Sequence, residues 1–105
     1  MELLKRLSNT PGVSGFEEQV QQIVVAELQG VCDEVRTDRI GNVIGLKRAT
    51  GVPEGVAPLK VMIAAHVDEI GFAVSHIDGE GFVRFMPVGG FDPRTIVAQR
   101  VIIHG

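Results

Sequence analysis

The feature that most constrains this chain is an apolar run, LKVMIAA, at residues 59–65. From Val61 to Ala65 apolar and polar side chains do not alternate. A strand of this kind is usually buried on both faces, with helices above and below the sheet. The run therefore predicts an interior strand of an α/β fold.

Two helices are predicted ahead of this run. The first is short, with Leu3, Leu4 and Leu7 at helical spacing, and it ends at the turn formed by residues 10–12. The second begins with a capping box, in which Ser14 accepts from first-turn amides and Glu17 reaches back to the Ser14 amide, and it stops at Gly30. Its apolar side chains form one stripe, so its other face is predicted to be exposed. The stripe consists of Phe16, Val20, Ile23, Val24 and Leu28.

Several β-strands are predicted on either side of the run. Residues 35–37 and 43–46 flank a turn and indicate a hairpin, and residues 48–58 contain two Gly and two Pro and indicate a loop. After Asp68, glycine-containing turns separate strands expected at 70–74, 82–85 and 96–103. This second half is typical of antiparallel, barrel-like β structure.

The change in pattern near Asp68 predicts a boundary between two modules, residues 1–68 and residues 69–105. An interior strand at 59–65 needs helices on both faces, yet the sequence offers one good amphipathic helix and one short one. The expected last strand also has no partner after it. We therefore expect that more polypeptide follows, or that the chain associates with other chains.

Composition excludes several classes of protein. The chain has 105 residues, 45% of them hydrophobic and 22% charged, as in a globular protein. A net charge of -3 with scattered Lys and Arg gives no surface for nucleic acid. No stretch is long enough to span a membrane, and residues 1–6 do not have the order of a signal peptide. Cys32 is the single cysteine, which fits a small buried side chain in a reducing cytoplasm.

The strongest candidate for chemistry is His66, at the end of the predicted interior strand. Ligands bind at this carboxyl end in open α/β sheets. An imidazole can bind a divalent metal through one nitrogen while a carboxylate near the other nitrogen fixes its tautomer. Spacing of two in an extended chain places His66 and Asp68 on one side, so either Asp68 orients His66 or both side chains reach toward the metal.

Other candidates have less support. His76 lies in a strand-like stretch and His104 is next to the end of the sequence. The neighbouring acids Asp33 and Glu34, like Asp68 and Glu69, point to opposite faces of an extended chain, so neither pair can flank a sugar as glycosidase carboxylates do. The sequence has no phosphate-binding glycine loop, CxxC pair or nucleophile elbow.

Four motifs, in order, cover most of the chain: TPGVSGFE at 10–17, DRIGNV at 38–43, AHVDEIGF at 65–72 and GGFDP at 89–93. They resemble the opening of the glutamyl and deblocking aminopeptidases, metallopeptidase family 42, some members of which have carried the labels endoglucanase or cellulase. The resemblance implies part of a zinc-peptidase-like catalytic domain, interrupted after the His-Asp motif by an antiparallel β-barrel-like dimerisation domain, here incomplete.

The resemblance also implies an activity. His66 corresponds to the first metal ligand and Asp68 to the acid that supports and orients it, and no other cofactor-binding residue is assigned. Two zinc or cobalt ions per complete subunit are implied, with a metal-activated water and a Glu base that remove N-terminal residues from short peptides. Dimers that assemble into dodecamers are implied as well. We expect this chain to be a fragment that is inactive alone; the alternative is a non-catalytic folding or assembly module.

Overall fold

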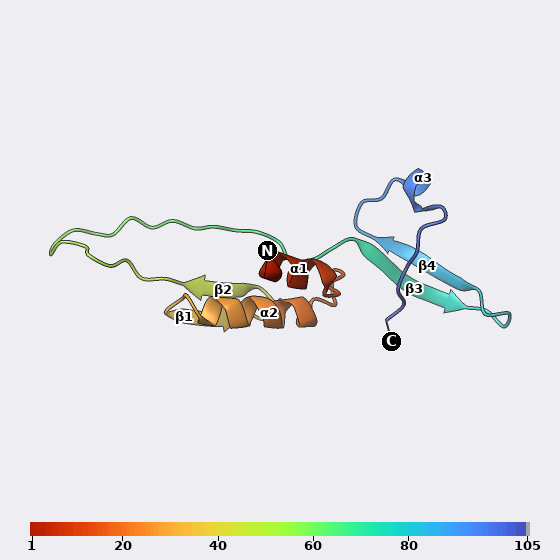
Figure 1. Cartoon of the computed structure of the whole chain (residues 1–105), viewed down its shortest axis with the longest axis horizontal. Coiled ribbons are helices and arrows are strands. Elements are labelled where there is room, and N and C mark those ends of the chain that lie inside the picture. The colour runs from red at the N-terminus through yellow and green to blue at the C-terminus, as the bar shows by residue number, and fades with distance from the viewer. Residues whose placement is uncertain (105) are drawn as a thin grey trace.

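The computed structural model describes residues 1–104 as an elongated molecule of 71 × 29 × 26 Å (Figure 1). Its radius of gyration is 19.3 Å, whereas a compact domain of this length has a value of about 13 Å. Within these residues, Val20 is the only buried hydrophobic side chain, 3% exposed. The described chain therefore holds local packing around Val20 but no extended core.

Helices α1 (Glu2–Asn9) and α2 (Glu18–Gln29) form the first part of the chain, as predicted. Arg6 of α1 donates to Glu27 of α2 at 2.8 Å, and α2 contacts both strands of the first hairpin. Gly30 ends α2, again as predicted, although its φ of -73° is right-handed. The predicted stripe holds for Val20, which is buried, and for Ile23, Val24 and Leu28, which are half-buried. Phe16 lies before the helix and is 71% exposed.

The predicted capping box is wrong. Helix α2 begins at Glu18, and its N-cap residue Glu17 makes no capping hydrogen bond with its side chain. Glu17 accepts instead from the amide of Gly15 at 2.8 Å, and the Ser14 hydroxyl donates to Asp68. The Ser14 hydroxyl, which the local pattern assigned to the start of α2, thus bonds to a carboxylate 54 residues away.

Both predicted hairpins form. β1 (Glu34–Thr37) pairs antiparallel with β2 (Val43–Leu46), and β3 (Gly71–Ile77) pairs antiparallel with β4 (Val83–Val88). Gly41, in the first turn, has a φ of 90°, a conformation that favours glycine. Phe72 of β3 contacts Phe85 and Phe91, at ring-centroid distances of 4.5 and 4.7 Å. The antiparallel character predicted after Asp68 is confirmed for this hairpin.

The predicted interior strand at 59–65 is wrong for the described chain. Residues 47–70 form a long loop that runs away from β2 and returns beside α1 (Figure 1), and residues 59–65 pair with no strand among residues 1–104. Met62 and Ile63 are 90% and 92% exposed. A strand needs a neighbour for its backbone N–H and C=O groups, and no described segment lies alongside to supply one.

The predicted last strand is wrong as well. A short helix, α3 (Pro93–Ile96), forms instead, and its N-cap residue Asp92 accepts from the Arg94 amide with its side chain. Residues 97–104 are neither helix nor strand. Ala98 has a φ of 62°, which interrupts an extended path. The fold is therefore mixed helix and antiparallel strand, with two separate two-stranded sheets. Gly105 lies outside the described residues.

Candidate metal-ligand site

The His66 side chain is placed against Asp68. Its Nδ1 lies 3.0 Å from Asp68 Oδ1 and 3.1 Å from the Asp68 carbonyl oxygen. A carbonyl oxygen only accepts, so these contacts require a proton on Nδ1. The neutral ring then carries its lone pair on Nε2, the nitrogen left for a ligand. Asp68 thus contacts the ring nitrogen of His66 that is not left for a ligand.

Asp68 is held from two sides. Its Oδ1 contacts His66, and its Oδ2 accepts from the hydroxyl of Ser14, which is 54 residues away in sequence. The Ser14 hydrogen bond first, and the His66 hydrogen bond second, lower the pKa of the Asp68 carboxyl below its usual value, because both stabilise the charged form. Asp68 is therefore ionised at neutral pH and can accept from both neighbours.

The next residue, Glu69, anchors this segment to the loop between α1 and α2. Its amide donates to the carbonyl oxygen of Gly12 at 2.8 Å, and its Oε1 accepts from the amide of Gly12 at 3.1 Å. Val13 and Glu69 also form an isolated parallel bridge. Sequence reasoning assigned Glu69 no such contact, because nothing local signals a partner 57 residues away.

His66 borders a depression of about 240 Å³ at the base of α1 and α2. Leu7, Ser8 and Thr10 line one side, and Val20, Val67 and Glu69 line the rest. The His66 side chain is 85% exposed, so Nε2 is accessible. Among residues 1–104, no three His, Cys, Asp or Glu side chains gather closely enough to hold a metal ion. The depression is thus lined by one imidazole, that of His66.

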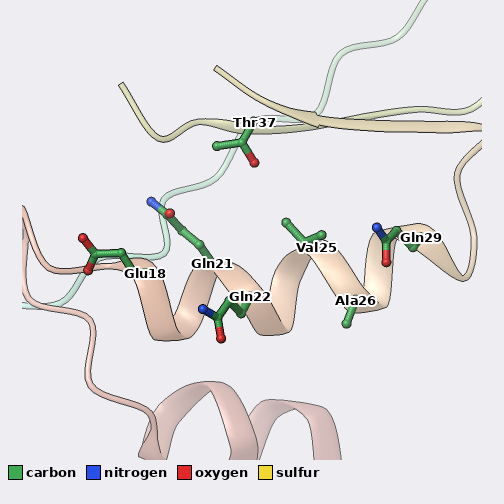
Figure 2. Close-up of a pocket in the computed structure, with 7 residues that line it drawn as sticks. All are labelled: Glu18, Gln21, Gln22, Val25, Ala26, Gln29 and Thr37. Atoms are coloured by element: carbon green, nitrogen blue, oxygen red, sulfur yellow. The ribbon is translucent and has the colours of Figure 1, made fainter. Parts of the chain in front are cut away.

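A larger depression, of about 370 Å³, lies between α2 and Thr37, away from His66. Figure 2 shows Gln21 and Val25 directed from α2 toward Thr37. Glu18 is its single titratable lining residue, so this hollow offers no constellation for catalysis. It is lined by Glu18, Gln21, Gln22, Val25, Ala26, Gln29 and Thr37.

The weaker candidates lie apart from His66. His76 is exposed on β3 opposite Arg84, and His104 is exposed in the segment after α3. Asp33 accepts from the Arg48 amide at 2.6 Å, which lowers its pKa, and Glu34 forms an ion pair with the Arg48 guanidinium. These acids therefore stabilise the β1–β2 hairpin.

Cys32 is a half-buried free thiol beside Gly45, less buried than predicted. No helix among the described residues has the length and apolar character to cross a membrane.

Comparison with known proteins identifies the class. The model of the M42 glutamyl aminopeptidase family matches residues 41–105, more than half of the chain. The lysyl aminopeptidase of Pyrococcus furiosus is 46% identical over 101 residues, which cover 95% of this chain and 27% of that protein. The chain belongs to the M42 glutamyl aminopeptidase family, and it spans about a quarter of the length of the curated relatives it matches.

Solved structures agree with this assignment. A TET aminopeptidase from a marine sediment thaumarchaeon matches 94% of this chain and 26% of its own, with 34% identity and a TM-score of 0.81. A Thermotoga maritima protein described as an endoglucanase matches 87% of this chain and 28% of its own, with 45% identity and a TM-score of 0.75.

Proposed function

We propose that this chain is part of a metal-dependent aminopeptidase, in which His66 supplies one metal ligand through Nε2 and Asp68 holds the imidazole in place. One observation carries the proposal: in a member of the M42 family, the ring of His66 is bonded at Nδ1 and accessible at Nε2. A metal-ligating histidine characteristically donates its other N–H to a carboxylate or carbonyl oxygen.

The donor chemistry of these residues fits a zinc or cobalt ion, and we propose two such ions per complete subunit. Imidazole nitrogen is a preferred ligand of both metals, and the bound ions would lower the pKa of a water so that it can attack a peptide carbonyl. Catalytic zinc sites generally use three protein ligands. His66 supplies one, so the other ligands and the general base must come from polypeptide other than residues 1–104.

We also propose that the chain contains parts of two domains. Residues 1–68 would belong to the catalytic domain, and residues 69–105 would begin a β-rich dimerisation domain. Two features support this division: the β1–β2 hairpin packs on α2, and the β3–β4 hairpin forms a separate sheet after Glu69. In the complete catalytic domain, residues 59–65 would join a sheet whose other strands lie outside the described residues.

The proposed substrates are short peptides with a free N-terminus, which the enzyme would cut in the cytoplasm. The proposed assembly is a homo-oligomer in which dimers form a dodecamer. The names of the relatives support the peptide substrate, and the resemblance to a TET aminopeptidase supports assembly. An endoglucanase activity has less support, because Asp33 and Glu34 are both engaged with Arg48. A purely assembling module remains the second candidate, favoured by exposed apolar residues such as Met62 and Ile63.

Replacing His66 by Ala in the polypeptide expressed from the natural gene tests the proposal. We expect metal content, measured by elemental analysis on folded protein, to fall by at least one ion per subunit, and hydrolysis of aminoacyl anilides to fall with it. His76→Ala is the matched control, because His76 is an exposed histidine on β3. A His66→Ala protein with its full metal complement and normal turnover would refute the assignment.

A further inference from the structure

The loop between α1 and α2 docks closely on the segment that carries His66. Two hydrogen bonds join the backbone of Gly12 to Glu69, one from the Glu69 amide and one to its side-chain Oε1, and Gly71 permits the close approach of Val13. A Cβ on Gly71 would collide with the Val13 side chain, whereas Gly12 makes its close contact with α2, where a Cβ would lie 2.9 Å from Val20 Cγ1. The loop and the segment therefore pack closely over several residues. These contacts fix the position of the Ser14 backbone relative to Asp68.

Ser14 directs its hydroxyl at the one carboxylate that contacts His66. Asp68 Oδ2 accepts from Ser14 Oγ, while Oδ1 lies 3.0 Å from His66 Nδ1. The hydroxyl makes no capping bond to α2. Ser14 does not cap a helix, and within residues 1–104 its hydroxyl hydrogen-bonds to Asp68.

A carboxylate with one bonded oxygen retains freedom to rotate. The last torsion of an Asp side chain has broad, roughly two-fold minima, and the Asp68 side chain is 38% exposed, so packing alone does not fix it. A donor on Oδ2 restricts this rotation and keeps Oδ1 facing Nδ1. The direction of Nε2 then depends on a chain of two hydrogen bonds that starts at Ser14.

We propose that Ser14 is a positioning residue for the metal site: it holds the Asp68 carboxylate, which holds the His66 imidazole so that Nε2 faces the metal. This inference rests on the proposed function, since it assumes that His66 is a ligand. It adds a residue from the α1–α2 loop that touches neither metal nor substrate. Loss of the Ser14 hydroxyl weakens metal binding without removing a ligand.

The test uses the polypeptide expressed from the natural gene and measures zinc affinity by competition with a chelator. Outer hydrogen-bond partners of metal ligands change affinity by about 10- to 100-fold, and we expect Ser14→Ala to weaken zinc binding about 10-fold. Excess zinc should restore peptidase turnover, because every ligand is still present. Ser14→Thr keeps a hydroxyl at an exposed position and should restore affinity. Ser75→Ala is the matched control, since it deletes a hydrogen bond from a serine on β3 to the Arg84 carbonyl on β4.

A double-mutant cycle separates positioning from general stability. Ser14 acts through Asp68, so Ser14→Ala should weaken zinc binding little further in an Asp68→Ala background. If Ser14→Ala binds zinc as Ser75→Ala does, if Thr fails to restore affinity, or if the two losses simply add, the inference is overturned. If His66→Ala keeps its full metal content, the proposed function fails instead, so the two failures are distinguishable.

Discussion

Helix α2 and residues 59–65 are both rich in apolar residues, yet their surroundings differ completely. Val20 of α2 is 3% exposed, whereas Ile63 is 92% exposed. A helix satisfies most of its backbone hydrogen bonds within itself, and a strand must find them in a neighbour. The difference teaches that α2 satisfies its backbone within itself, while residues 59–65 have no partner strand among residues 1–104.

His66 stands where these two kinds of region meet. It directly follows the unpaired run, but its position is set from the other side, through Asp68, Ser14 and the Gly12–Glu69 contacts. The site is thus tied to the locally determined part of the molecule. These contacts can keep the imidazole oriented although residues 59–65, which precede it, pair with no strand among residues 1–104.

The largest effect concerns the activity of the 105-residue chain by itself. We expect the 105-residue chain to hydrolyse no aminoacyl anilide, because His66 is one donor and two-metal hydrolysis needs ligands from several elements and a general base. Rates measured with added zinc or cobalt check this. Steady hydrolysis by purified chain, abolished by a chelator, would show that the described residues suffice.

The next effect tests the hydrogen bonds around the site. In the polypeptide expressed from the natural gene, Asp68→Asn keeps a hydrogen-bonding side chain but loses the charge that raises imidazole basicity. We expect activity at limiting metal to fall by about 10- to 100-fold. Added zinc or cobalt should rescue Asp68→Asn partly and His66→Ala poorly. Equal rescue of both variants would contradict the distinction between a ligand and the residue that orients it.

The sequence predicted those elements whose hydrogen bonds are local. Helices α1 and α2 and both hairpins were expected near their observed positions, because helical spacing and glycine turns such as Gly41 act over a few residues. The strands at 59–65 and 96–103 were wrong, since an apolar pattern does not supply a partner. For the site, spacing brought His66 and Asp68 together, but the Ser14 contact crosses 54 residues and had no local signal. The metal role itself stays a prediction.

Packing around α2 provides a direct measure of the same contrast. Val20→Ala removes two buried methyl groups beneath Gly12 and should lower the free energy of unfolding of the 105-residue chain by about 2 kcal/mol. Met62→Ala, at a site 90% exposed, should change it by less than about 0.5 kcal/mol. Urea denaturation followed by circular dichroism checks both. Equal effects would mean that residues 59–65 are packed in solution.

The exposed run should also drive association of the isolated chain. Contiguous apolar surface and unpaired backbone favour self-association, so Ile63→Lys should weaken it by about tenfold, equivalent to about 1.4 kcal/mol. Thr50→Lys adds the same charge at another exposed position of the long loop and serves as the control. Analytical ultracentrifugation measures both. A monodisperse monomer before any substitution would show that the run is protected without a partner.

The smallest expected effect lies in the first hairpin turn, where stability should depend on pH through Asp38. The Asn42 side chain, above all, lowers the pKa of Asp38 from its usual 3.8, and the amides of Asn42 and Ile40 also donate to this carboxylate. Because the folded-state pKa is depressed, the carboxylate stabilises the hairpin above pH 3.8. That contribution is lost as the pH falls through the lower folded-state value. Asp38→Asn should therefore reduce the change in melting temperature between pH 5 and acid, at roughly pH 2.

Glu54→Gln is the control: the Glu54 side chain makes no hydrogen bond within residues 1–104, so this variant should leave that change intact. If Asp38→Asn and the unsubstituted chain lose the same stability in acid, the hydrogen bonds to the Asp38 carboxylate do not stabilise the first hairpin.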